Sequence, residues 1–435
     1  MGQCSSFLSA LWSRGCRIEE VIDDACFRPP CPCHYILSEV ANRIVGQVFV
    51  KGMAIQIPNN VFICYLPISV DVRICCMHIH NPGSRGVILY SHGNATDCGG
   101  MLPRCMQMVE VLHVDVIVYD YEGYGFSDGY HTEDALFRDI EAVFAYALGC
   151  YYPDSIFLYG ESIGSVGVCH VAAKISQMQR QLQRQLQRQS HSKSHSKLHS
   201  KSHSKSHSKT RRRRAPTAME EVEGGIELDP TPSCASAQRQ VMRAYHISHF
   251  HGNVEGDTSP APTESSLSVI SNSGSTAASG PPTLHRTDLL GFSFFTSEHI
   301  NPALVSACEI AALFVEEGRK RFRQGGLQIG GVILHSALLS GARAVFSCNP
   351  LLCIDRFDNS HNAKKITCPV FHIHGMKDGI VPFECGRQLY RLTKSAYEPW
   401  WISDAHHGDI VKNHEREYYE RLDHFLGSCL QHSSP

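Results

Sequence analysis

Short, almost entirely apolar runs recur along the chain, separated by segments long enough to form helices. They lie at residues 86–93 (G-V-I-L-Y-S-H-G), 114–121 (V-D-V-I-V-Y-D-Y), 156–160 (I-F-L-Y-G), 331–336 (G-V-I-L-H-S) and 369–375 (P-V-F-H-I-H-G). Runs of this length that alternate with helices are typical of a mostly parallel sheet with helices on both faces. The pattern therefore predicts an α/β fold.

The chain before these runs has a different pattern of apolar and turn residues. Residues 61–66 (V-F-I-C-Y-L) and 73–80 (R-I-C-C-M-H-I-H) are apolar and separated by turn residues, which indicates an antiparallel opening of the sheet. The first 35 residues are irregular and rich in cysteine, and they end in a P-P-C-P-C run. We expect them to form an arm outside the sheet.

A long interruption separates the third apolar run from the fourth, at residues 177–325. It begins with a Gln/Arg-rich stretch, continues with S-H-S-K tetrads at about 190–209, and reaches four arginines at 211–214 before a Ser/Pro/Gly-rich stretch. Such a composition buries too little apolar surface to offset chain entropy, so we expect most of it to be disordered. The exception is a helix expected near 302–323, with Asn301 as its cap.

The tetrads suit a solvated linker, because their serine and lysine disfavour a helix. Attraction to an anionic membrane surface and metal binding are the alternatives.

The order of these segments along the chain predicts a cysteine-rich N-terminal arm at residues 1–35, an α/β domain in two parts at 36–176 and 326–435, and the insertion at 177–325. The two parts together have the size of one α/β domain.

Composition narrows the class of protein. Hydrophobic residues make up 43% of the chain, and twelve basic side chains with no acidic one gather at residues 180–214 although the net charge is −2. The rest of the chain is therefore acidic, and we expect no nucleic-acid partner. Nineteen cysteines without a secretory signal indicate reduced thiols in the cytosol. No apolar run is long enough to span a membrane.

The G-E-S-I-G sequence at residues 160–164 is the first candidate for chemistry. A G-x-S-x-G sequence by itself is a weak signal. Here it follows a predicted strand and precedes a segment that can form a helix, which is the strand-turn-helix setting of a nucleophile elbow. This context favours Ser162 as a catalytic nucleophile over an ordinary bend.

A serine nucleophile needs a histidine base and an acid that orients it, and in this fold both follow the serine along the chain. Asp378 follows the apolar run P-V-F-H-I-H-G, with Asp355 and Asp404 as alternatives. His407 lies in S-D-A-H-H-G-D-I before the last predicted helix, and spacing alone leaves its neighbour His406 open.

Two N–H donors must stabilise the negative charge on the attacked carbonyl oxygen. The N–H of Ile163 is one by its position after the serine. The other is expected from Asn94 in S-H-G-N, where Gly93 lets the backbone turn closely. The alternative is that S-H-G-N only caps a helix.

Five motifs together resemble the alpha/beta-hydrolase-domain-containing protein 17 family of serine hydrolases. They are S-H-G-N-A-T-D, Y-D-Y-E-G-Y-G-F-S-D-G, L-Y-G-E-S-I-G, V-I-L-H-S-A-L-L-S-G and H-G-M-K-D. The resemblance implies an α/β-hydrolase fold with Ser162 as nucleophile, Asp378 as acid and His407 as base, because A-H-H-G-D-I aligns with the family's Ala-Gly-His-Asn-Asp-Ile. It also implies a protein depalmitoylase attached to membranes through a palmitoylated cysteine-rich N-terminus, to which P-P-C-P-C looks similar.

The chain departs from this family in three places. Glu161 stands before the serine where the family has Gln, His406 stands before the predicted base where the family has Gly, and the 149-residue insertion has no known counterpart. The first two lie beside the predicted chemistry and bear on substrate preference.

The N-terminus reads M-G-Q-C-S-S and fits the N-myristoylation pattern at Gly2. One myristoyl chain binds membranes only with about 10⁴ M⁻¹, so Cys4 is expected to carry a palmitate. The other N-terminal cysteines are further lipidation sites or zinc ligands, for which C-P-C-H has poor spacing. We expect a lipid anchor on the cytoplasmic face of the plasma or endosomal membrane.

The function expected from the sequence is cleavage of palmitoyl thioesters on S-acylated proteins through an acyl-enzyme intermediate. The thiol leaving group has a pKa near ~8.5 and departs with little protonation. A lipid esterase or acylglycerol lipase and a catalytically silent binding scaffold are the alternatives. We expect a monomer that uses no metal or cofactor.

Overall fold

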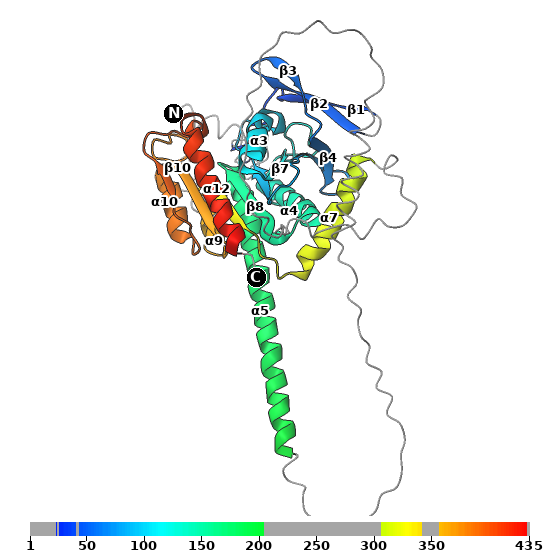
Figure 1. Ribbon diagram of the computed structural model, residues 1–435, viewed down its shortest axis with the longest axis vertical. Helices are drawn as coiled ribbons and strands as arrows, with labels where there is room; N and C mark the ends of the chain where they lie inside the picture. Colours follow the sequence, from blue (N-terminus) through cyan, green and yellow to red (C-terminus); the bar gives the residue numbers. More distant parts are fainter. Residues whose placement is uncertain (1–22, 24–25, 41–42, 204–305, 342–355, 433–435) are drawn as a thin grey trace, which may run out of the picture. The chain divides into compact units, whose positions relative to one another are not determined.

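An eight-stranded sheet forms the centre of the folded domain in the computed structural model (Figure 1). The structure describes residues 23, 26–40, 43–203, 306–341 and 356–432. Within them the strand order is β11-β10-β9-β8-β6-β7-β5-β4. The strands from β11 to β7 are parallel, and β5 and β4 add an antiparallel edge. The predicted α/β class and the mostly parallel sheet are confirmed.

Each of the five predicted apolar runs forms a strand of this sheet. The bounds are β4 Val61–Pro67, β5 Arg73–Ile79, β6 Val87–Ser91, β7 Asp115–Tyr119, β8 Ile156–Glu161, β9 Gly331–His335, β10 Val370–Gly375 and β11 Trp400–Ile402. Strands β6, β7, β9 and β10 are buried at every position. Burial on both faces explains why these segments carry no alternation of polar and apolar residues.

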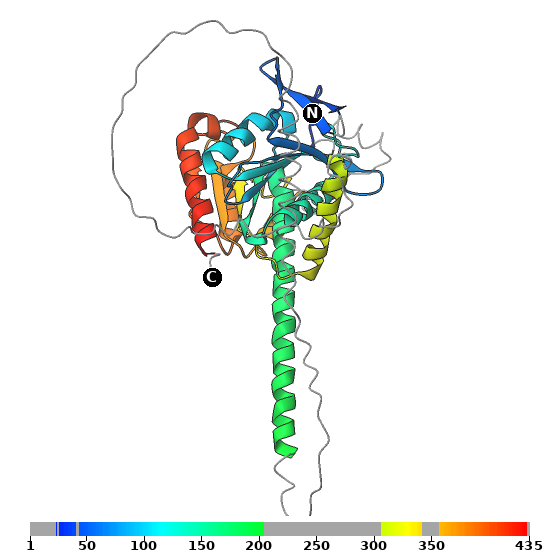
Figure 2. The same ribbon diagram turned by 45° about the vertical axis from the view of Figure 1, so that its right-hand side comes forward.

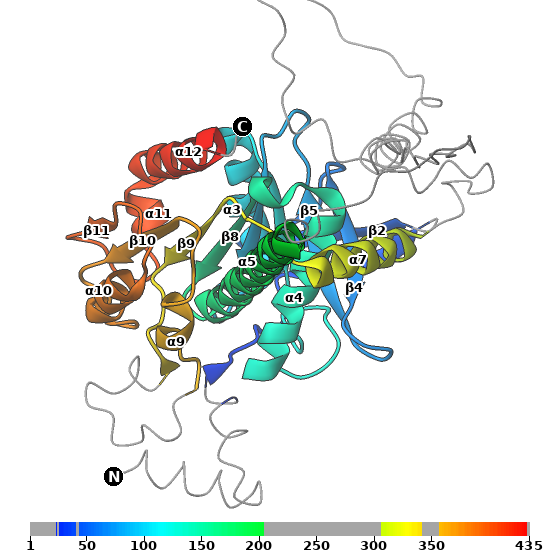
Figure 3. The same cartoon turned by 90° about the horizontal axis from the view of Figure 1, so that it is seen from below.

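Helices cover both faces of the sheet (Figures 2 and 3). Helix α3 contacts β5, β7 and α12 on one face, while α4 and α5 contact β6 on the other and α7 packs against α4 and β4. The bounds are α3 Cys98–Leu112, α4 Glu133–Cys150, α5 Gly164–His203, α7 Ala307–Gln324, α9 Ser360–Ala363, α10 Phe383–Leu392, α11 Ile410–Asn413 and α12 Glu415–His432, with a short 3₁₀ turn at Pro153–Ser155.

Helix α7 is the helix expected near residues 302–323, but it begins later than the sequence suggested. Ser306 is its N-cap: the Ser306 hydroxyl accepts a hydrogen bond from the Glu309 N–H, and the Glu309 carboxylate accepts one from the Ser306 N–H. This reciprocal capping box satisfies two N–H groups at once. Asn301, the expected cap, lies outside the described residues.

Helix α5 extends past residue 176, the predicted end of the first part of the domain, and corrects the expectation that the tetrads do not form a helix. It continues for 40 residues, into the histidine-containing tetrads. Its first turns are buried, whereas residues 181–189 are almost all exposed. Gln, Arg and Leu are good helix formers, and extending an existing helix costs little once its first turn has formed. Residues 204–305, where disorder was predicted, lie outside the described residues.

A second, three-stranded antiparallel sheet consists of β1 Tyr35–Val40, β2 Arg43–Val50 and β3 Met53–Gln56. Tyr35 and Val48 anchor it in the main core. Ahead of β1, Phe27 is buried, and the His34 N–H donates to Asp97 Oδ2 at 2.7 Å. Residues of the predicted arm therefore contact the folded domain, while the predicted bounds of the arm, 1–35, stay a prediction.

The cysteines of the described part are free thiols. None of the helices in the described ranges has the length and apolar character needed to cross a bilayer.

Candidate active site

Ser162 lies on the sharp turn between β8 and α5. Its φ is +53°, a conformation that is costly for a residue with a side chain and is found at nucleophile elbows. A methyl group on Gly160 would come within 2.6 Å of Ser165 Cα, and one on Gly164 would overlap the Ser91 carbonyl. Both glycines of G-E-S-I-G are therefore required by close packing around the serine.

The structure brings Ser162, His407 and Asp378 together from three loops, which follow β8, β11 and β10. His407 Nδ1 donates to Asp378 Oδ2 over 2.7 Å. This hydrogen bond leaves His407 Nε2 as the acceptor for the Ser162 hydroxyl, 3.1 Å away. A base that accepts the serine proton and an acid that orients the base are thus in hydrogen-bond contact.

The Asp378 carboxylate is held in its charged form. Its Oδ1 accepts hydrogen bonds from the N–H groups of Ile380 and Val381 at 2.9 and 2.8 Å. Burial by itself would raise the pKa of Asp378, but interactions with His374, His407 and Val381 outweigh it and hold that pKa below its usual range. A negative charge therefore faces His407 at neutral pH.

The alternative residues lie elsewhere. His406 is exposed, and its N–H donates to Asp409. Asp404 has a side chain that is 64% exposed and pairs with His414. Asp355 lies outside the described residues. The geometry therefore selects His407 over His406, a choice that spacing alone left open.

The two predicted oxyanion donors belong to chain segments next to the serine. A methyl group on Gly93 would lie 3.8 Å from Ser162 Cβ, so the S-H-G-N loop passes directly beside the nucleophile. Ile163 comes immediately before α5, where the first N–H groups of a helix have no acceptor within the helix. The oxyanion role of Ile163 and Asn94 stays a prediction.

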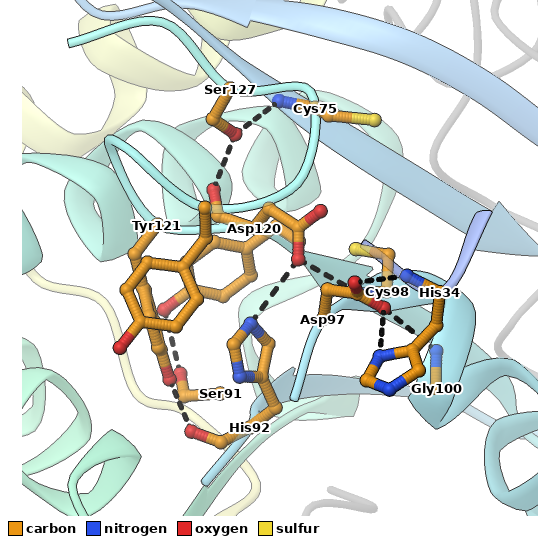
Figure 4. Close-up of polar contacts among 12 residues, drawn as sticks. His34, Cys75, Ser91, His92, Asp97, Cys98, Gly100, Asp120, Tyr121 and Ser127 are labelled. Carbon is orange, nitrogen blue, oxygen red and sulfur yellow. Dashed lines mark hydrogen bonds and ion pairs between the residues drawn. The ribbon is translucent and has the colours of Figure 1, made fainter. Parts of the chain in front are cut away.

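A buried carboxylate that sequence reasoning missed supports this loop (Figure 4). Asp120 follows β7 and accepts hydrogen bonds from the Cys98 N–H at 2.8 Å and the Tyr35 hydroxyl at 2.5 Å. His92 Nε2 lies 3.4 Å from it, and the Tyr121 hydroxyl donates to the His92 carbonyl. Asp120 thus ties the loop to the start of α3. The sequence feature that could have indicated Asp120 was its position in the motif Y-D-Y-E-G-Y-G.

Glu161, the departure beside the nucleophile, is paired. Its carboxylate accepts a hydrogen bond from the Tyr90 hydroxyl at 2.6 Å, and both of its oxygens lie 3.1 Å from Arg104 Nη1. Burial alone would raise the pKa of Glu161, but Arg104, His335 and Tyr90 outweigh it and lower that pKa to about 2. The negative charge next to Ser162 is therefore balanced by Arg104.

No group of three or more His, Cys, Asp or Glu side chains in the described part of the chain could hold a metal ion. The predicted lipidation sites, Gly2 and Cys4, lie outside the described residues.

Several known proteins are similar in sequence to this chain. Alpha/beta hydrolase domain-containing protein 17C of Xenopus tropicalis is 24% identical over 363 residues, which cover 82% of this chain and 67% of that protein. Human 17C is 24% identical over 368 residues, covering 83% and 65%. Human protein 17B is 39% identical over 106 residues, which are 23% of this chain and 36% of that protein. The resemblance to the protein 17 family is confirmed.

The chain spans about two thirds of the length of its protein 17C relatives. No family model matches it. Among solved structures, an esterase of Pyrococcus furiosus aligns with a TM-score of 0.41 and 13% identity over 85% of this chain and 93% of the esterase. Mouse alpha/beta hydrolase domain-containing protein 10 aligns with a TM-score of 0.38 and 14% identity over 84% and 98%. The protein 17 relatives and the serine-histidine-aspartate contacts support a hydrolase.

Proposed function

We propose that this chain is a serine hydrolase that cleaves palmitoyl thioesters on S-acylated proteins, and that it works as a monomer without a metal or cofactor. One observation carries the proposal: His407 lies within hydrogen-bond distance of both Ser162 and Asp378. The thioester preference rests on the resemblance to the protein 17 family and on leaving-group chemistry.

The reaction follows from these contacts. Ser162 Oγ attacks the thioester carbonyl while its proton passes to His407 Nε2, and Asp378 stabilises the imidazolium that forms. The carbonyl oxygen becomes negatively charged and accepts hydrogen bonds from the N–H groups of Ile163 and Asn94. The C–S bond then breaks and His407 returns the proton to the departing thiolate. Water, deprotonated by His407, attacks the acyl-enzyme, and His407 returns this proton to Ser162 Oγ as the fatty acid leaves.

Substrate preference separates a thioesterase from a lipase. We expect kcat/KM for an S-palmitoyl peptide to exceed that for a monoacylglycerol by at least about tenfold, because a thiolate leaves more readily than an alkoxide. Both rates are measured on the purified full-length protein in the same detergent. Faster turnover of the monoacylglycerol would favour the lipase alternative, and failure to react with a fluorophosphonate would favour the scaffold.

We propose that the protein is held on the cytoplasmic face of a plasma or endosomal membrane by myristate on Gly2 and palmitate on Cys4. A single myristoyl chain binds membranes only marginally, so the second lipid is needed for stable attachment. The pattern M-G-Q-C-S-S is the supporting feature.

Gly2→Ala is expected to move the protein from the membrane fraction to the soluble fraction of a cell lysate, because loss of myristate leaves at most one lipid. Gly427→Ala is the matched control, since a methyl group on Gly427 would meet no atom within 4 Å, and it should leave the distribution unchanged. Full membrane recovery of Gly2→Ala would contradict the two-lipid anchor.

A further inference from the structure

A short segment ahead of β1 crosses the loops around the predicted active site. We call this segment the strap and define it by its described residues, 23 and 26–28. Its centre is Phe27, which is only 2% exposed. The Phe27 ring packs against Tyr124, His131 and Phe357, with ring centroids 6.2, 5.3 and 5.6 Å away. Three side chains from two loops therefore enclose one aromatic side chain of the strap.

The strap holds the side chain of Asn94. Asn94 Oδ1 accepts hydrogen bonds from the Arg28 N–H and the Tyr124 hydroxyl, each at 2.8 Å. Asn94 Nδ2 donates to the Cys26 carbonyl. The Arg28 N–H also donates to the Tyr124 hydroxyl at 2.9 Å. The Asn94 amide is therefore engaged at both ends by groups other than the catalytic side chains.

An ion pair fixes the far end of the strap. Asp23 is 2% exposed and lies 3.1 Å from Arg356, which in turn lies 3.0 Å from Glu133. Glu133 also accepts a hydrogen bond from the Phe357 N–H. Through these contacts the strap joins the loops that follow β6, β7 and β9, all at the carboxyl edge of the sheet where the nucleophile lies.

The loop held by the strap needs such support. Gly93 has no side chain with which to pack, and Ala95 has a φ of +58°, which is unfavourable for a residue with a side chain. An oxyanion donor works only if its N–H lies about 2.7–3.1 Å from the developing charge. The Asn94 side chain therefore holds the backbone between Gly93 and Ala95, in addition to the contacts that Asp120 and Tyr121 make with His92.

We infer that the strap positions the backbone N–H of Asn94 for oxyanion stabilisation, so that Cys26, Phe27 and Arg28 are positioning residues for the reaction. The inference rests on the proposed function. It assigns two roles to Asn94: the backbone N–H faces the substrate oxygen, and the side chain fastens the loop to the strap. The segment that leads to the expected lipid anchor is then part of the catalytic architecture.

Asn94→Ala tests this directly, because it keeps the backbone N–H and removes every side-chain bond to the strap. On the full-length protein we expect kcat for an S-palmitoyl peptide to fall by about 10- to 100-fold, less than the loss of a whole donor, with KM changed by less than about threefold. Asn60→Ala is the matched control: Asn60 makes one side-chain bond to a backbone carbonyl in a distant turn and should keep wild-type kcat.

Phe27 variants separate positioning from stability. Phe27→Ala should lower kcat, Phe27→Leu should restore most of it, and the Phe27→Ala/Asn94→Ala double variant should be no slower than Asn94→Ala, because both changes release the same loop. Unchanged kcat in Asn94→Ala, or losses that multiply in the double variant, would overturn the inference.

The rate of fluorophosphonate labelling, compared between each variant and the wild type, gives a readout that does not depend on the thioester substrate. It keeps the two proposals apart. If the wild-type protein labels rapidly but cleaves no thioester, the proposed substrate class fails. The same labelling rates in the Asn94 and Phe27 variants still decide whether the strap positions the loop.

Discussion

Ser162→Ala is expected to lower kcat for an S-palmitoyl peptide by about 10⁴-fold or more. The variant removes the oxygen that His407 contacts at 3.1 Å and leaves the binding surface intact, so KM should change little. Because Ala carries the same positive-φ strain as Ser at this turn, the unfolding temperature should stay near that of the wild type. Steady-state kinetics and thermal unfolding on the full-length protein measure both.

The control for this variant is His406→Ala, which alters an exposed side chain next to the predicted base. It should label with a fluorophosphonate like the wild type, whereas Ser162→Ala should not label. Labelling of Ser162→Ala at the wild-type rate would mean that another nucleophile reacts.

Asp378→Asn is expected to lower kcat by about 10³- to 10⁴-fold. Asp378 Oδ1 accepts two backbone N–H groups, from Ile380 and Val381, so the carbonyl oxygen of the new amide must occupy that place. Its NH₂ group then faces His407 Nδ1 and donates to it. The imidazole proton is forced onto Nε2, and this nitrogen can then no longer accept the Ser162 proton.

Asp404→Asn provides the comparison, since the Asp404 carboxylate is exposed and solvent screens its contact with His414. That variant should keep kcat within about twofold. If Asp378→Asn retained a tenth of the wild-type kcat or more, the orienting role of Asp378 would have to be abandoned.

Much of the domain could be predicted because the informative patterns are local. A buried parallel strand is a short apolar run, and β6 to β10 all have this form. Ser162 was recognised from its neighbours in the chain, and Asp378 from the strand that precedes it. The structure brings these residues to His407. Spacing along the chain could not distinguish His407 from its neighbour His406.

The missed features depend on contacts between distant parts of the chain. Arg28 and Asn94 are separated by 66 positions. A periodic sequence pattern does not predict that an irregular cysteine-rich segment packs on a loop. The end of α5 was missed for a different reason: composition predicted a solvated tract, but solvated residues with good helix propensity can extend a helix that is already anchored. Ser306 caps α7 together with the glutamate three residues later, a capping-box signal that the choice of Asn301 overlooked.

The pairing of Glu161 with Arg104 is one-sided. An arginine at position 104 beside an amide is tolerable, because its side chain is 27% exposed and can be hydrated. A glutamate at position 161 without that arginine would leave a carboxylate that is only 15% exposed without its cation, which is costly. Glu161 therefore depends on Arg104, whereas Arg104 does not depend on Glu161. A change at position 104 alone should cost more stability than the same change made together with Glu161→Gln.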